Sequence, residues 1–270
     1  MPSSAKLIPI SAQAIILSDI LGMNSFDSHV NALEWATTSE WLHLVASIKS
    51  VCIDVVQHEK SFGWCENADT HTMQMDRMLN ESVKALTEFV FAWNALESTI
   101  TNVNPPKNRD KSKRGKIRNA SAFIESHFDR HSILYGYRQS LIEFLEIAEH
   151  YLDPQRLTGK LAEGSETGFA GSGLICIYEL RNKFAHGALN IHEVNLEDEK
   201  SGAHFKVFQL ATRITLLSIQ HLLLAKFESC TETVESRWKD ANGEKEYPIG
   251  KVLRECHFFV TENSSQTSLF

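Results

Sequence analysis

The sequence predicts an all-α fold, a bundle of four to five long helices with minor additions. Apolar residues recur at intervals of three and four over several long stretches, which is the period of one face of an α-helix. Prolines and glycines separate these stretches, as at Asn104-Pro105-Pro106. The chain shows no internal repeat and no hairpin-rich region. Helices packed around one core therefore account for the pattern best.

The composition is that of a soluble globular protein. The 270 residues are 43% hydrophobic, 23% charged and 9% aromatic, which suits one domain with elaborations. The 27 Lys and Arg residues against 34 Asp and Glu residues give a net charge of −7. This balance does not indicate a polyanionic partner, so contact with nucleic acid would depend on a local basic patch.

The cysteines and the N-terminal residues predict a cytoplasmic protein without a membrane span. The five cysteines are odd in number, lie far apart and form no C-x-x-C pair, which favours reduced thiols. Pro9, Gln13 and Asp19 interrupt the apolar residues near the N-terminus, so we expect no signal peptide. No stretch approaches about eighteen uninterrupted apolar residues, the length that a membrane helix needs.

The first half of the chain predicts two long helices after a weakly patterned start. Residues 1–36 form an N-terminal extension in which only Ser11–Leu21 has the pattern of a short amphipathic helix. A long helix is expected from about residue 38 to Lys60, with apolar residues at Trp41, Leu44, Val45, Ile48, Val51, Cys52, Val55 and Val56. After a break at 61–64, a longer one is expected over about 70–101, with a stripe at Met75, Met78, Leu79, Val83, Leu86, Val90, Trp93, Leu96 and Ile100.

Four more helices are expected in the second half. Two short ones lie at about 120–128 and 137–152, and Asp153-Pro154 closes the latter. A glycine-rich lead-in precedes a helix that ends near Gly187, and a long apolar helix covers about 205–227. The helical domain is thus expected to span 37–228, with its motif-bearing core at about 70–228. A polar C-terminal tail follows at 229–270, with one short strand at about 256–260.

The stretch Tyr178-Glu179-Leu180-Arg181-Asn182-Lys183-Phe184-Ala185-His186-Gly187 carries the strongest functional signal. On a helix that turns about 100° per residue, Asn182 and His186 lie nearly in line, one turn apart. Arg181 lies about 140° around the axis from His186. Two such helices at a two-fold axis would bring both pairs into one cleft, so the spacing predicts a composite site in a homodimer.

Arg181-Asn182-x3-His186 resembles the R-[N/H/D]-x3-H signature of the HEPN superfamily, all-α proteins that include bacterial toxin and phage-defence ribonucleases. The resemblance extends to "LRNKFAHG" at 180–187 and "ALES" at 95–98, which are similar to the ApeA-like branch, and covers about residues 70–228. It implies a cytoplasmic, homodimeric and metal-independent ribonuclease without a cofactor. Such a protein acts as a toxin or abortive-infection effector, under an antitoxin or another regulatory partner.

The resemblance also implies a role for each site residue. His186 is the general acid and base, because an imidazole exchanges protons near neutral pH. Arg181 holds the phosphate with its fork of donors. Asn182 orients the imidazole, and Glu97 pairs with Arg181 or with a histidine nitrogen. Cleavage by a ribose 2′-hydroxyl needs such proton transfer and such charge stabilisation.

Three alternatives stay open at this point. Arg and His at the end of a helix often only neutralise its dipole and its terminal carbonyls. The resemblance is also compatible with an inactive HEPN module, because some members of the superfamily serve only in dimerisation or nucleotide binding. "RNKFAH" at 181–186 is also similar to the corresponding segment of the mannitol-repressor-like regulators, which are all-helical and act through partners. An antitoxin modified on a tyrosine two residues past the histidine is not supported, because that position is Ala188.

The one strongly basic stretch is a candidate RNA-binding segment. It lies between Pro106 and the next helix and carries Lys107, Arg109, Lys111, Lys113, Arg114, Lys116 and Arg118. It holds no interleaved aromatic residue, so it does not predict base stacking, and a solvated loop is the alternative. His127 and His131 lack an obvious third ligand, so we expect no metal site there.

Overall fold

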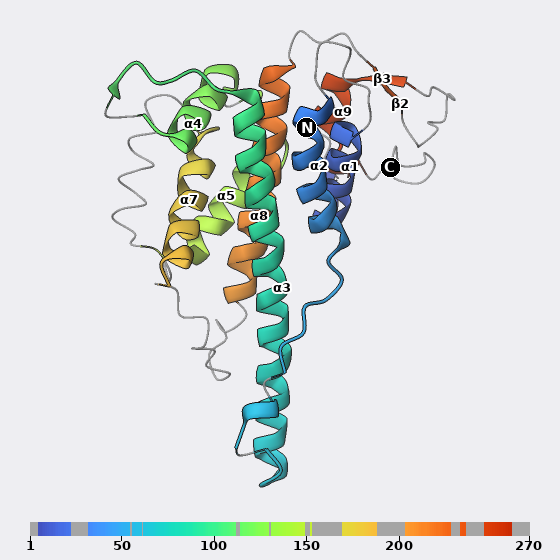
Figure 1. The fold of residues 1–270 in the computed structure, drawn as a ribbon, viewed down its shortest axis with the longest axis vertical. Coiled ribbons are helices and arrows are strands. Elements are labelled where there is room, and N and C mark those ends of the chain that lie inside the picture. The colour runs from blue at the N-terminus through green and yellow to red at the C-terminus, as the bar shows by residue number, and fades with distance from the viewer. Residues whose placement is uncertain are drawn as a thin grey trace.

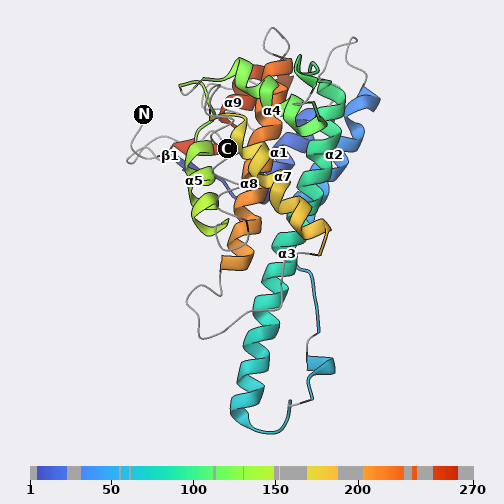
Figure 2. The ribbon, with the colours of Figure 1, turned by 90° about the vertical axis from the view of Figure 1, so that its left-hand side faces the viewer.

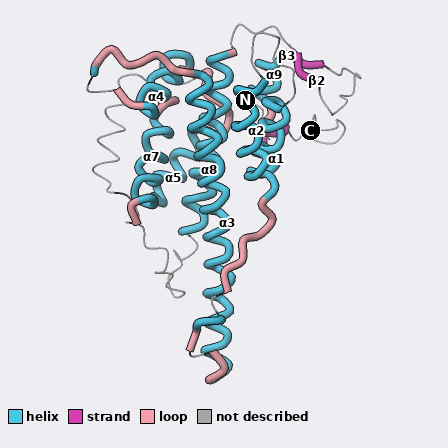
Figure 3. Tube along the Cα trace, in the orientation of Figure 1, coloured by secondary structure: helices cyan, strands magenta, loops and turns pink. Residues whose placement is uncertain are grey.

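A computed structural model describes residues 5–22, 32–54, 56–60, 62–111, 114–129, 131–148, 152, 169–187, 203–227, 233–235 and 246–260. Helices make up most of this part of the chain, which confirms the all-α prediction (Figure 1). Strands occur only as three-residue segments in it, and these lie at the margin of the helices (Figure 3).

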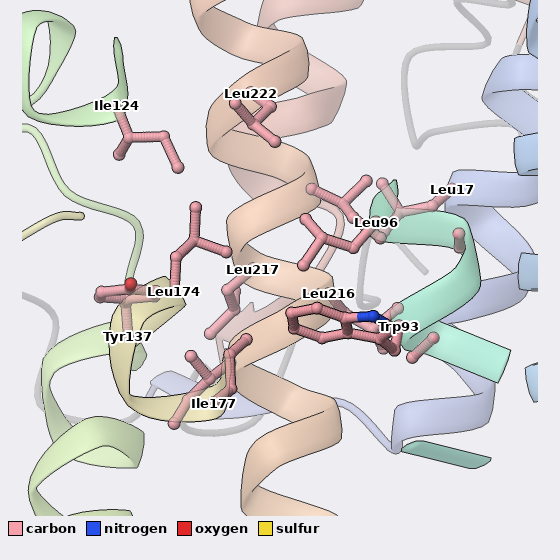
Figure 4. Close-up of a cluster of buried hydrophobic side chains, with 14 of the residues drawn as sticks. Leu17, Trp93, Leu96, Ile124, Tyr137, Leu174, Ile177, Leu216, Leu217 and Leu222 are labelled. Carbon is pink, nitrogen blue, oxygen red and sulfur yellow. The ribbon is translucent and has the colours of Figure 1, made fainter. Parts of the chain in front are cut away.

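The central element is α8, Ala203–Lys226, against which most of the other helices pack. Residues 211–225 are buried on every face of this helix, and leucines and isoleucines fill seven of those fifteen positions. Figure 4 shows Leu216, Leu217 and Leu222 of α8 among side chains from the helices on either side. By length and composition Phe205–Lys226 would also suit a membrane, but 89% of its apolar 18-residue window is buried in the fold. It is the core helix of the bundle.

The longest element is α3, Glu66–Val103, which matches the helix expected over 70–101. Asn104 ends it in the left-handed conformation, with φ 50°, and donates its backbone N–H to Ile100 O at 3.0 Å. The C-terminal half of α3 packs against α8 and α2, whereas its N-terminal half projects from the bundle as an arm (Figures 1 and 2).

The helix expected from residue 38 to Lys60 is wrong in its second half. The observed α2, Ala32–Ser47, begins earlier and ends thirteen residues sooner, and only a short 3-10 turn, Val56–His58, follows. The chain instead runs along the arm, where Ile53 N donates to Asn80 Oδ1 at 2.6 Å and Asn80 Nδ2 donates to Ile53 O at 3.2 Å. β-Branched residues such as Val51 and Ile53 favour an extended backbone, and Asn80 supplies its hydrogen bonds.

Both ends of the described chain belong to the same core. Helix α1, Ile10–Gly22, buries Leu17 and Leu21 against α2 and α8. Strand β1, Ala5–Leu7, pairs antiparallel with β4, Phe258–Val260, and β2, Thr233–Glu235, pairs with β3, Glu246–Pro248. Helix α9, Ile249–Glu255, lies against α8. Parts of the N-terminal extension (1–36) and of the C-terminal tail (229–270) therefore pack with the helical domain. The short strand expected at about 256–260 is β4.

A buried polar network fastens these ends to α8. Arg213 donates to Gln13 Oε1 and to Ile8 O, and Gln13 donates to Gln220 Oε1. Gln220 Nε2 in turn donates to Leu253 O at 2.8 Å. Each of these polar groups is satisfied by a partner on another segment, so the network links β1, α1, α8 and α9.

Arg213 in this network and the nearby histidines His221 and His257 are buried. Burial lowers the pKa of Arg213 to about 10. Burial also lowers the pKa of His257 to about 4 and that of His221 to about 3. Both imidazoles are therefore neutral at neutral pH. His221 Nε2 accepts the backbone N–H of Leu134 at 3.1 Å, and His257 Nε2 lies 3.1 Å from Tyr135 O.

Candidate active site at the C-terminal end of α7

The motif lies on α7, Ser172–Ala185, and the helix ends as its sequence predicts. Gly187 adopts φ +66°, a left-handed conformation that suits glycine, and donates its N–H to Phe184 O at 3.0 Å. His186 is the capping residue before it. Leu174, Ile177 and Leu180 are fully buried and hold α7 against the bundle.

Glycines allow the start of α7 to lie close to α4, Lys116–His127, and α5, Tyr137–Ala148. A Cβ on Gly171 would lie 2.5 Å from the backbone oxygen of Ser121, and one on Gly173 would lie 2.3 Å from Tyr137 Oη. Ser121 Oγ donates to Gly171 O at 2.9 Å. These contacts fix the start of α7, and with it the direction in which the motif residues project.

Arg181 and Glu97 both contact one residue, Trp93 of α3. The guanidinium carbon of Arg181 lies 6.0 Å from the centre of the Trp93 ring, a cation–π distance. The indole Nε1–H of Trp93 donates to Glu97 Oε1 at 2.9 Å. The link between Arg181 and Glu97 is therefore the indole, and no ion pair joins them within the described residues. Arg181 and Glu97, the arginine and the acidic residue predicted for the site, nonetheless both lie beside the Trp93 indole.

Tyr178 completes this cluster. Its ring lies 6.1 Å from that of Trp93, with the two planes 20° apart, so the rings are stacked with an offset. Trp93 is 3% exposed, whereas Tyr178 is 36% exposed. By sequence alone, Trp93 belongs to the apolar stripe of α3 and Tyr178 has no predicted role in the site. The available signal was spacing, because Trp93 precedes Glu97 by four residues and Tyr178 precedes Arg181 by three, one helical turn in each case.

His186 lies at the exposed end of the helix, and Asn182 lies one turn before it. Asn182 O accepts the backbone N–H of His186 at 3.0 Å. Within the described residues, no hydrogen bond joins the Asn182 side chain to the imidazole. Arg181 is thus half-buried against Trp93, while His186 faces solvent. Neither group is enclosed.

The basic segment lies at the other end of α7. Its residues are exposed wherever the structure describes them, namely Lys107, Arg109, Lys111, Arg114, Lys116 and Arg118, and Lys113 lies outside the described residues. The segment leads into α4, whose Ser121 contacts the start of α7. His186 is fifteen residues beyond Gly171, about 22 Å along a helix. The structure therefore places the basic residues and His186 at opposite ends of α7 (Figure 1).

The two histidines near the end of α4, His127 and His131, flank a turn that the Asp129 side chain forms. Asp129 Oδ1 accepts the backbone N–H groups of His131 and Ser132 at 2.9 Å each, and these hydrogen bonds lower the pKa of Asp129. His127 Nδ1 lies 2.8 Å from Phe123 O. In the part of the chain that the structure describes, no three His, Cys, Asp or Glu side chains gather as metal ligands would.

The cluster at α7 combines a guanidinium, a carboxylate and two stacked aromatic rings, and an accessible imidazole lies at the end of the same helix. A guanidinium binds phosphate oxygens, and an imidazole transfers protons near neutral pH. Comparisons with protein-family models, with curated proteins and with solved structures gave no significant match.

Proposed function

We propose that the protein is a metal-independent endoribonuclease of the HEPN type. The observation that carries this proposal is the exposed end of α7, where Arg181, Asn182 and His186 follow the family's spacing and Glu97 reaches Arg181 through Trp93. Glu97 and Arg181 are far apart in sequence, so their meeting at one indole supports a shared site.

The proposed reaction is an internal transfer at phosphorus. The ribose 2′-oxygen forms a bond to the adjacent phosphorus while the bond from phosphorus to the 5′-oxygen breaks. A base accepts the 2′-hydroxyl proton and an acid delivers a proton to the departing 5′-oxygen. An imidazole such as that of His186, exposed at the helix end, is suited to either of these two proton transfers. Arg181 stabilises the negative charge that builds on the phosphoryl oxygens.

The active unit would be a homodimer. One subunit offers a single His186, whereas the reaction needs both a base and an acid. Arg181 and His186 also point to different sides of α7, because five residues turn a helix by about 140°. A second copy across a two-fold axis would supply the missing imidazole. Light scattering over a concentration series, run beside the cleavage assay, tests whether activity follows the dimer.

The direct experiment is cleavage of a single-stranded RNA by the purified full chain in excess EDTA. We expect cleavage to persist and to leave 2′,3′-cyclic phosphate and 5′-hydroxyl ends. His186→Ala and Arg181→Ala should abolish it, with unchanged circular dichroism, because these side chains lie outside the buried stripe of α7.

Matched controls come from the same chain. His131→Ala removes an exposed imidazole at the α4 turn, and Arg77→Ala removes an exposed guanidinium on the arm. Both variants should cleave as the parent does. Loss of all cleavage on chelation, or a fully active His186→Ala protein, would refute the mechanism.

The proposed biological role is that of a toxin or antiphage effector in the cytoplasm, restrained by an antitoxin or another regulatory partner. Induced expression should then arrest growth, and His186→Ala alone should relieve the arrest. The competing proposal is an all-helical regulatory protein that acts by binding. Growth arrest that is equal for the parent and His186→Ala would favour that alternative.

A further inference from the structure

Tyr178 is the most exposed residue in its part of α7. Its neighbours Ile177 and Glu179 are buried, at 0% and 6% exposure, while 36% of Tyr178 is accessible. Tyr178 precedes Arg181 by one helical turn, about 4.5 Å along the axis. The two side chains therefore lie side by side on the accessible stripe of α7 that leads to His186.

Trp93 holds both of these side chains. The Tyr178 ring stacks on the indole, and Arg181 lies over the same indole. Trp93 is itself buried and fixed by its hydrogen bond to Glu97 at 2.9 Å. A buried, hydrogen-bonded ring has few accessible rotamers, so it presents Tyr178 and Arg181 in one arrangement before any ligand binds.

The groups along α7 come in the order in which a bound nucleic-acid strand would contact them. His186 lies at the end of the helix, Arg181 and Tyr178 come before it, and the exposed basic residues lie beyond the start of the helix. In the proposed dimer, Arg181 and a His186 are suited to one phosphate. An accessible aromatic ring beside a phosphate-binding arginine is the combination that binds a base and its phosphate together. The basic segment holds no aromatic residue of its own, so base stacking along this path would fall to Tyr178.

We propose that Tyr178 stacks on a base next to the scissile phosphate, and that Trp93 positions Tyr178 and Arg181 for this contact. The inference rests on the proposed ribonuclease function, of which it names the residue that recognises an unpaired base. A base inside a duplex has no free face, so the contact selects single-stranded segments.

The test uses a short single-stranded RNA and its 2′-O-methyl counterpart, which lacks the attacking hydroxyl. Tyr178→Leu should weaken binding of the 2′-O-methyl strand about 5- to 150-fold by fluorescence anisotropy, the factor that one stacked base contributes. Tyr178→Phe keeps the ring and should bind within about twofold of the parent. On the cleavable strand, Tyr178→Leu should raise KM and change kcat little, because stacking holds substrate and transition state alike.

A scan with abasic nucleotides separates stacking from a structural role. Removing one base at the stacked position should weaken binding to the parent by the same factor and should not weaken binding to Tyr178→Leu. The control is Trp64→Leu, which removes an aromatic side chain that is 80% exposed on the arm, and binding should be unchanged. Urea unfolding of each variant shows that the fold is intact.

Each outcome decides the proposal. If the parent cleaves RNA and Tyr178→Leu binds as tightly, or if no abasic position removes the Tyr178 effect, stacking is refuted while the ribonuclease stands. If the 2′-O-methyl strand binds with the Tyr178 dependence and no RNA is cleaved, the stacking site stands and the catalytic proposal falls. If the parent neither binds nor cleaves, both fall.

Discussion

Glu97 should stabilise the protein mainly through the Trp93 indole, and a double-mutant cycle tests this. Trp93 Nε1–H donates to Glu97 Oε1 at 2.9 Å, and Trp93 is only 3% exposed. Glu97→Ala would leave a buried N–H without its acceptor, which costs about 1–3 kcal/mol. Glu97 is half-buried, so solvent replaces part of the lost bond and we expect about 1 kcal/mol. Glu97→Gln keeps an oxygen acceptor and should cost about half as much.

The cycle adds Trp93→Phe, which removes the N–H donor and keeps an aromatic ring. In that background both Glu97 variants should lose most of their effect, giving a coupling of about 1 kcal/mol. The free energies of unfolding come from urea titrations followed by circular dichroism, with equal slopes in all variants. If Glu97→Ala costs the same in both backgrounds, to within about 0.3 kcal/mol, the indole is not what holds Glu97.

Two further predictions concern the core. Gly173→Ala should destabilise the protein by about 1–2 kcal/mol in a urea titration, because the new Cβ would lie 2.3 Å from Tyr137 Oη. This overpacking outweighs the gain of about 1 kcal/mol that alanine usually brings to a helix. The control is Gly250→Ala in α9, where a new Cβ would meet nothing within 4 Å, and it should be neutral or stabilising. Stability should be complete above about pH 6.5 and fall at lower pH, because His257 and His221 titrate near 6.5 when unfolded but at about 4 and about 3 when folded. Between these values each imidazole contributes a slope of about 1.4 kcal/mol per pH unit, and His257→Gln should remove about half of their joint slope in urea titrations at pH 7.5, 6 and 5.

The helices that could be predicted are those with a long apolar period and a clear stop. α3, α7 and α8 satisfy both conditions, with Asn104 and Gly187 as the stops of the first two. The stretch 48–60 failed because its β-branched residues repeat at helical spacing, while the competing partner, Asn80, lies on another element. The apolar residues near 256–260 predicted β4, but β1 is only three residues long and pairs with β4 across most of the chain, so no local pattern predicts β1 or this pairing.

The site residues also divide into those that the sequence could predict and those that it could not. Arg181 and His186 could be proposed because they belong to a motif with fixed spacing, and Glu97 because "ALES" at 95–98 resembles the family's acidic position. Trp93 fits the apolar stripe of α3 equally well, and its second role arises only where α7 brings Arg181 over the indole. Tyr178 reads as one more aromatic residue in a helix until its exposure is known. Spacing of one helical turn relates Trp93 to Glu97 and Tyr178 to Arg181, but only the contacts between α3 and α7 bring the two pairs together.

The pairing of β1 with β4 makes the two ends of the fold one cooperative unit. Ala5 lies opposite Val260 in the register, and Ile8 O accepts from the buried Arg213. Fraying of either end would break the hydrogen bonds between β1 and β4, and fraying of the N-terminal end would also remove an acceptor from Arg213. The two ends should therefore open together. In this antiparallel register the hydrogen-bonded pairs include Ile8 with His257 and Lys6 with Phe259. Native-state hydrogen exchange should therefore show the amides of Lys6, Ile8 and Phe259 opening together, at one free energy. A deletion at either terminus would loosen the opposite one as well.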